Sequence, residues 1–134
     1  MEIRIAKELL HIQHWLEIAA SIVARGKDSY LADEVAQEAG DALMMKIGEA
    51  AKTLSARGLD APDGLNWSDA AKNREKLAHH YSIIDREVTW QTLSASLPRW
   101  GEALSSLFVQ AAVTIDRDYD PGKLPEAKLS DFGD

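Results

Sequence analysis

The side chains best suited to chemistry lie close together near the middle of the chain, at Arg74, His79 and Tyr81. A histidine can take up and release a proton near neutral pH, because its unperturbed pKa is about 6.5. An arginine is always charged and presents a planar fork of N–H donors that matches pairs of phosphate oxygens. Together the two groups could act on a phosphodiester without a metal ion, one by moving protons and the other by stabilising negative charge.

The spacing of these residues does not fit one face of a regular helix. At about 100° per residue, positions five apart lie about 140° apart around the axis. Arg74 and His79 therefore point in different directions, whereas Tyr81 nearly shares the face of the arginine. Either the helix ends near His79 and the backbone turns it inward, or two copies of the chain combine their residues, as a two-fold dimer allows.

Each of the three residues also has a purely structural explanation. Arg74 could form a surface ion pair with Glu75 or Asp69. His79 could lie at the C-terminus of a helix, where the macrodipole favours positive charge. Tyr81 could be a half-buried packing residue with a solvated hydroxyl.

The spacing of apolar residues predicts an all-α fold of five to six helices and no sheet. The predicted helices cover roughly residues 5–23, 29–35, 43–54, 67–79, 88–97 and 98–111. Gly26 should end the first helix, and Asn66 should cap the helix that begins at Trp67. Pro98 suits the first turn of a separate sixth helix. Residues 1–115 are thus expected to form one helical domain, followed by an acidic, flexible tail over residues 116–134.

Composition narrows the possible functions. The chain has 134 residues, of which 46% are hydrophobic, enough for the core of one domain. It has no cysteine, which excludes disulfides and thiolate metal sites. No basic leader and no run of about 20 apolar residues is present, so a soluble, cytoplasmic protein without a membrane partner is expected.

The net charge of −7 argues against a general nucleic-acid binder. Residues 72–86, however, hold four basic and two acidic residues. This locally basic window could be a binding site, although a solvated helix face is the commoner reason for such a pattern.

The segment 73–81, NREKLAHHY, resembles the Arg-x4-His-x-Tyr signature of HepT-like proteins, a branch of the HEPN superfamily. Further similar segments follow in the same order over roughly residues 3–107. They are the KIGEAAK segment at 46–52, Asn66-Trp67, Trp90 and Leu97-Pro98. HepT-like proteins often have asparagine directly after the motif arginine, where this chain has Glu75.

This resemblance implies a compact HEPN-type bundle that forms a two-fold homodimer and acts as a metal-independent endoribonuclease toxin. Arg74 and His79 would then be catalytic, and Lys72 and Lys76 would contact the RNA. No cofactor and no metal are implied. Glu75 and the acidic surface also fit an alternative, a non-catalytic scaffold that binds its partner without cleaving RNA, and a purely structural helical dimer is a third possibility.

The implied partner is an MntA-like minimal nucleotidyltransferase, the antitoxin of a type VII toxin–antitoxin pair. It would use ATP to attach AMP to the motif tyrosine, Tyr81. An added nucleotide brings negative charge and bulk to the place where an RNA phosphate must lie.

Other motifs favour structural explanations. Glu8 and His11 have the Glu-x-x-His spacing of di-iron bundles, with His14 one turn later, but no second copy exists in the sequence. We therefore expect them to lie on an exposed face of the first helix. Gly48 is expected to permit close packing of two helices. The tryptophans are expected in the core or in a dimer interface, and they are Trp15, Trp67, Trp90 and Trp100.

Overall fold

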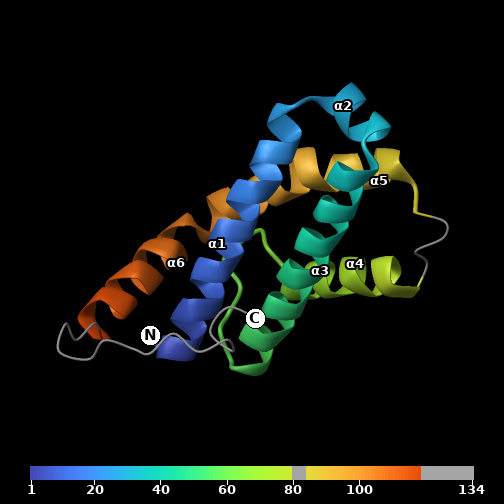
Figure 1. The fold of residues 1–134 in the computed structure, drawn as a ribbon. Coiled ribbons are helices and arrows are strands. Elements are labelled where there is room, and N and C mark those ends of the chain that lie inside the picture. The colour runs from blue at the N-terminus through green and yellow to red at the C-terminus, as the bar shows by residue number, and fades with distance from the viewer. Residues whose placement is uncertain (80–83, 119–134) are drawn as a thin grey trace, which may run out of the picture.

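The computed structural model describes the backbone of residues 1–79 and 84–118, and the side chains of those residues apart from 75, 76, 78 and 79. The described part of the chain consists of helices and loops, with no strand (Figure 1). The helices are α1 (Ile3–Ala24), α2 (Lys27–Ala32), α3 (Glu34–Ala56), α4 (Trp67–His79), α5 (Arg86–Gln91), a π-helical segment η2 (Thr92–Ser96), and α6 (Leu97–Asp118). The predicted all-α class is confirmed.

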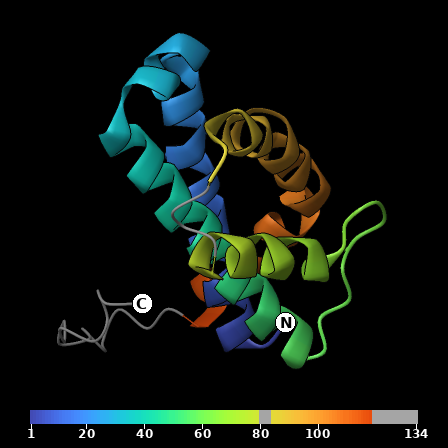
Figure 2. The same cartoon turned by 90° about the vertical axis from the view of Figure 1, so that its right-hand side faces the viewer.

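The long helices α1, α3 and α6 form the body of the bundle, with α1 between the other two (Figure 1). Two clusters of buried side chains hold this body together. One is centred on Leu9, Leu54 and Leu104, and the other joins Tyr30 and Leu93 to the opposite half of α3. Helix α4 packs on α3 and reaches it through the loop that is seen at the side of the bundle in Figure 2.

The beginning of α3 differs from the sequence prediction. Asp33 caps α3, because its carboxylate accepts the backbone N–H groups of Val35 and Ala36. The helix therefore begins nine residues before the predicted 43, and α2 ends before the predicted 35. The predicted break is absent because Gly40 and Asp41, which interrupt the apolar pattern, are both buried inside α3.

The start of α4 agrees with the prediction. The side-chain oxygen of Asn66 accepts the backbone N–H of Ser68 at 3.0 Å. Trp67 is buried, and its indole N–H donates to the carbonyl of Leu59 at 2.8 Å. This bond ties the loop between α3 and α4 to the core and fixes where α4 begins.

Pro98 lies in the first turn of α6, as predicted, but no loop separates α6 from the helix before it. Helices α5 and α6 continue into each other through η2, where the N–H of Leu97 bonds to the carbonyl of Thr92, five residues earlier. Proline has no N–H to donate and its ring crowds the preceding turn of an α-helix. The wider π-helical turn makes room for Pro98. The hydrogen-bond pattern changes there, and the helix continues instead of ending.

The predicted flexible tail begins inside a helix, since α6 extends to Asp118. The remaining tail residues, 119–134, lie outside the described part of the chain, so the domain boundary and the tail stay predictions. Among the described helices, none combines the length and the apolar character that crossing a lipid bilayer requires.

Candidate active site

The motif helix α4 contacts α3 at an unusually short distance. A Cβ atom added to Gly48 would lie 2.6 Å from the backbone oxygen of Ala70 and 2.7 Å from the Cβ of Arg74. Only glycine permits the two backbones to come this close. The prediction that Gly48 serves helix packing is confirmed, and its neighbour across the contact is the motif arginine.

Arg74 reaches from α4 to the outer side of α3, where it pairs with Glu49. Its Nε lies 3.0 Å from Oε2 of Glu49, with the arginine side chain 33% exposed and the glutamate 58% exposed. The terminal nitrogens Nη1 and Nη2 have no hydrogen bond to any described residue. A guanidinium held by Nε still offers its other edge to a phosphate.

Glu49 is not among the site residues predicted from the sequence. Of the two predicted partners, Asp69 forms no ion pair with Arg74, and the side chain of Glu75 lies outside the described residues. The signal was present, because Glu49 follows Gly48 within the KIGEAAK segment. The sequence pattern does not give the relative position of α3 and α4, and this position brings the arginine next to the carboxylate of Glu49.

The structure describes only part of the other predicted site residues. The backbone of His79 is the last residue of α4, which matches the predicted helix end. The side chains of His79 and Lys76, and all of Tyr81, lie outside the described residues. Lys72 is exposed on α4. Whether Arg74, His79 and Tyr81 meet in one site therefore stays a prediction.

A buried ion pair lies where the chain re-enters the bundle after the motif. Nη1 of Arg86 donates to Oδ1 of Asp41 at 2.7 Å, with side chains only 22% and 5% exposed. The hydrogen bond that Arg86 donates to Asp41 raises the pKa of Arg86, while burial opposes the rise and the Asp41 charge adds to it. The other carboxylate oxygen of Asp41 is buried without a partner among the described residues.

A hydrogen bond between two side chains attaches the same corner to α2. The hydroxyl of Thr89 donates to the carbonyl of Arg86, so it accepts the hydrogen bond from the hydroxyl of Tyr30. Asp85 caps α5 by accepting the N–H of Glu87 at 2.9 Å. The first turn of α5 is therefore fixed to α2 and α3, immediately beyond the motif segment.

The Glu-x-x-His segment of α1 is not fully exposed, so that prediction is wrong in part. The Glu8 side chain is 14% exposed, and the half-buried ring of His11 lies 5.6 Å from that of Trp15. His14 is exposed as expected. In residues 1–79 and 84–118, no three His, Asp or Glu side chains are grouped so that they could hold a metal ion.

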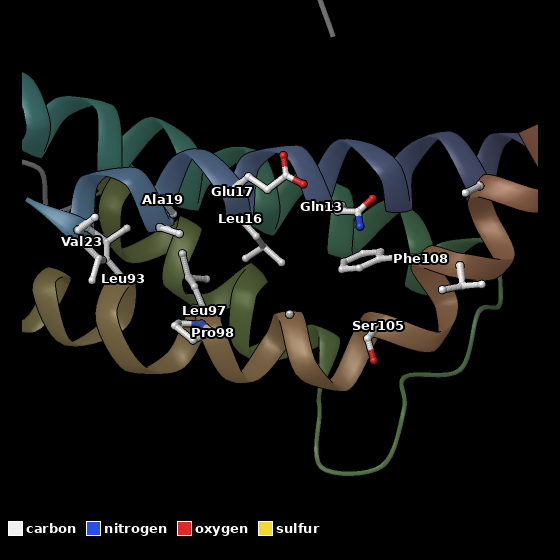
Figure 3. Close-up of a pocket in the computed structure, with 15 residues that line it drawn as sticks. Gln13, Leu16, Glu17, Ala19, Val23, Leu93, Leu97, Pro98, Ser105 and Phe108 are labelled. Atoms are coloured by element: carbon white, nitrogen blue, oxygen red, sulfur yellow. The ribbon is translucent and has the colours of Figure 1, made fainter.

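An apolar groove of about 760 Å³ lies between α1, η2 and α6 (Figure 3). Figure 3 shows Leu16 of α1 and Phe108 of α6 on its two walls. The groove is lined mostly by aliphatic side chains and contains no histidine, arginine or lysine. It therefore lacks the groups that act on a phosphodiester, and the candidate active site is at α4.

Comparison with known proteins identifies a family and two relatives. The family model described as "Ribonuclease HepT-like" matches residues 12–107, more than half of the chain. A Methanocaldococcus jannaschii protein that carries the name "Putative RNase" is 32% identical over 53% of this chain and 59% of its own length. A Caldanaerobacter subterraneus protein with the same description is 25% identical over 66% of this chain and 82% of its own length.

The aligned part of this chain thus spans less than two thirds of the M. jannaschii protein. No solved structure matches significantly. The family match covers the whole of α3 and α4, including the Arg74–Glu49 pair and the backbone of the motif helix. The chain belongs to the HepT-like ribonuclease family.

Proposed function

We propose that this chain is a metal-independent endoribonuclease toxin that cleaves cellular RNA. The observation that carries the proposal is the state of Arg74 in a member of a ribonuclease family. Its terminal nitrogens form no hydrogen bond to a described residue, and its side chain is partly exposed. An always-charged fork in this state suits a phosphate ligand better than a purely structural role, which would use the whole guanidinium.

In the proposed reaction the 2′-oxygen of a ribose attacks the adjacent phosphorus, and the bond from phosphorus to the 5′-oxygen of the next nucleotide breaks. A histidine, His79, takes the proton of the 2′-hydroxyl, and a second protonated group gives a proton to the leaving 5′-oxygen. Arg74 stabilises the additional negative charge on the phosphorane. The products are a 2′,3′-cyclic phosphate and a free 5′-hydroxyl, and Lys72 and Lys76 contact neighbouring phosphates.

The proposed active form is a homodimer. Arg74 and His79 are five residues apart on α4, so a regular helix directs them about 140° apart. A two-fold axis near α4 places the arginine of one copy beside the histidine of the other, and the second histidine supplies the proton for the leaving group.

Regulation is proposed to act through Tyr81. An MntA-like nucleotidyltransferase attaches the AMP of ATP to the tyrosine hydroxyl, with release of pyrophosphate. The new phosphodiester carries a negative charge next to the motif, where it repels the RNA backbone.

The test is incubation of the purified chain with total RNA in the presence of EDTA, beside His79→Ala and Arg74→Ala variants. Cleavage with cyclic phosphate ends that both substitutions abolish is the expected result. A requirement for magnesium, or full activity without His79, contradicts the mechanism. An inactive but folded chain that binds the nucleotidyltransferase would favour the scaffold alternative.

A further inference from the structure

A second polar site lies on the opposite flank of α4 from Arg74. A crevice separates α4 from η2 and the first turns of α6, and it has two adjoining parts of about 160 and 240 Å³. Asp69, Ser96 and Trp100 line both parts, Asn73 lines the first, and Arg99 lines the second. The smaller part alone has the volume of about five water molecules, which is room for a flat ring.

Three of the polar groups around this crevice form no hydrogen bond within the described part of the chain. The carboxylate of Asp69, the side-chain amide of Asn73 and the hydroxyl of Ser96 have no hydrogen bond or ion pair with any described residue. By contrast, the nearby hydroxyls of Thr92 and Ser94 are bonded to carbonyls of their own helix. The unbonded groups come from two separate elements and converge on one cavity, which is the arrangement of a ligand site.

The π-helical turn explains how the far wall is built. Its N–H groups bond to carbonyls five residues earlier, so Thr92 and Ser96 lie on the same side of the widened turn. Single π-helical turns occur often at functional sites. Trp100 follows one turn later, packed edge-on against Trp67 at 5.8 Å between ring centroids and still partly exposed.

We propose that this crevice binds an unpaired base of the RNA, one that carries an amino group. Single-stranded RNA is recognised by stacking of bases on aromatic rings and by hydrogen bonds to base edges. Asn73 offers both a donor and an acceptor, and the Asp69 carboxylate accepts only, which suits the exocyclic amino group of adenine, cytosine or guanine. A carboxylate would repel a phosphate, so a base edge is the better match, while Arg99 at the rim is available to the backbone.

The crevice and Arg74 can belong to one RNA path. Asn73 and Arg74 are adjacent and point about 100° apart, one into the crevice and one toward α3. Lys72 lies on the exposed side of α4, from which an RNA strand could pass between the two. The inference rests on the proposed function in this one respect, that the ligand is RNA; the base-binding site itself does not depend on cleavage.

Binding of 2′-O-methyl hexanucleotides tests the inference without cleavage, because they lack the attacking hydroxyl. Fluorescein-labelled A6, C6 and U6 are titrated with the wild-type chain and with the Asn73→Ala, Asp69→Asn and Asp116→Asn variants. We expect A6 and C6 to bind about tenfold more tightly than U6. Asn73→Ala and Asp69→Asn should remove this preference. Asp116→Asn, an exposed change on α6, should keep it.

Equal binding of the three hexamers by the wild-type chain, or a preference that survives both crevice substitutions, overturns the inference. Urea midpoints and circular dichroism of the variants establish that each is folded. The two proposals fail separately in this design. Cleavage of total RNA without a base preference removes only the crevice, whereas a base preference without cleavage removes only the nuclease mechanism.

Discussion

The close contact between α3 and α4 can be tested by giving Gly48 a side chain. In Gly48→Ala the new Cβ would lie 2.6 Å from the backbone oxygen of Ala70, about 0.8 Å inside the 3.4 Å at which ordinary contact begins. The atom it meets is the backbone oxygen of Ala70 in the first turn of α4, which cannot rotate away as a side chain can. The two helices must therefore separate by several tenths of an ångström, and Arg74 must move with them.

The expected magnitude follows from two opposing effects. Overpacking of a close contact costs about 1–3 kcal/mol. Replacing glycine by alanine within a helix returns about 1 kcal/mol. The net free energy of unfolding should fall by up to about 2 kcal/mol, and RNA cleavage should fall further than the loss of folded protein explains, because the Arg74–Glu49 pair is displaced.

Gly101→Ala is the matched control, since it adds the same methyl group to a helix interior. Its Cβ would meet only the Cδ1 of Leu16, at a comfortable 3.8 Å, so the variant should be more stable by about 0.5–1 kcal/mol. Urea unfolding measures both, and with a slope of about 1–3 kcal/mol per molar the midpoints should move in opposite directions. An upward shift of the two midpoints by the same amount would refute the close contact.

Three further substitutions separate the contributions of individual groups. Glu49→Ala should lower the rate of RNA cleavage up to about fivefold, because an exposed ion pair contributes about 0.2–1 kcal/mol. Glu49→Gln should restore part of the lost activity. Faster cleavage by Glu49→Ala would show instead that the ion pair inhibits Arg74. Asp41→Ala should lower the free energy of unfolding, measured in urea, by about 3 kcal/mol, because it leaves the mostly buried guanidinium of Arg86 unpaired. Glu87→Ala, in the exposed Lys27–Glu87 pair, should lower it by less than about 1 kcal/mol. Similar losses for the two variants would contradict the difference in burial. Tyr81→Phe should stay folded and active yet gain no AMP when incubated with the nucleotidyltransferase and ATP, as intact mass would show; equal modification would place the acceptor elsewhere.

The helices could be predicted from the sequence because apolar residues at helical spacing reflect burial against a core. The prediction failed where burial has another cause. Gly40 is buried because its missing side chain makes room for Leu93, and Asp41 is buried because an arginine 45 residues later pairs with it. Neither cause is local, so an apolar pattern misses both and starts α3 too late.

The continuous junction before Pro98 was not predicted, for a related reason. Pro98 removes one backbone hydrogen bond, and that loss has two structural solutions, a new helix or a wider turn. Packing of Leu93 and Leu97 in the same cluster keeps α5 and α6 in line and favours the wider turn. The choice depends on tertiary contacts, which the residues around the proline do not encode by themselves.

The charge of the motif region likewise depends on tertiary contacts, which a count of residues does not include. Counting bases over residues 72–86 suggests a basic surface, but Arg86 is buried against Asp41 and Arg74 is held through Nε by Glu49. In the described part of this window, Lys72 is exposed without an ion pair, so little positive charge is available for phosphates. Each phosphate contact on single-stranded RNA adds about 0.7 to the salt dependence of binding, so few contacts mean a shallow dependence. The proposed nuclease would therefore obtain part of its affinity from other contacts with RNA, and in the described part of the chain the polar groups beside Trp100 can supply them.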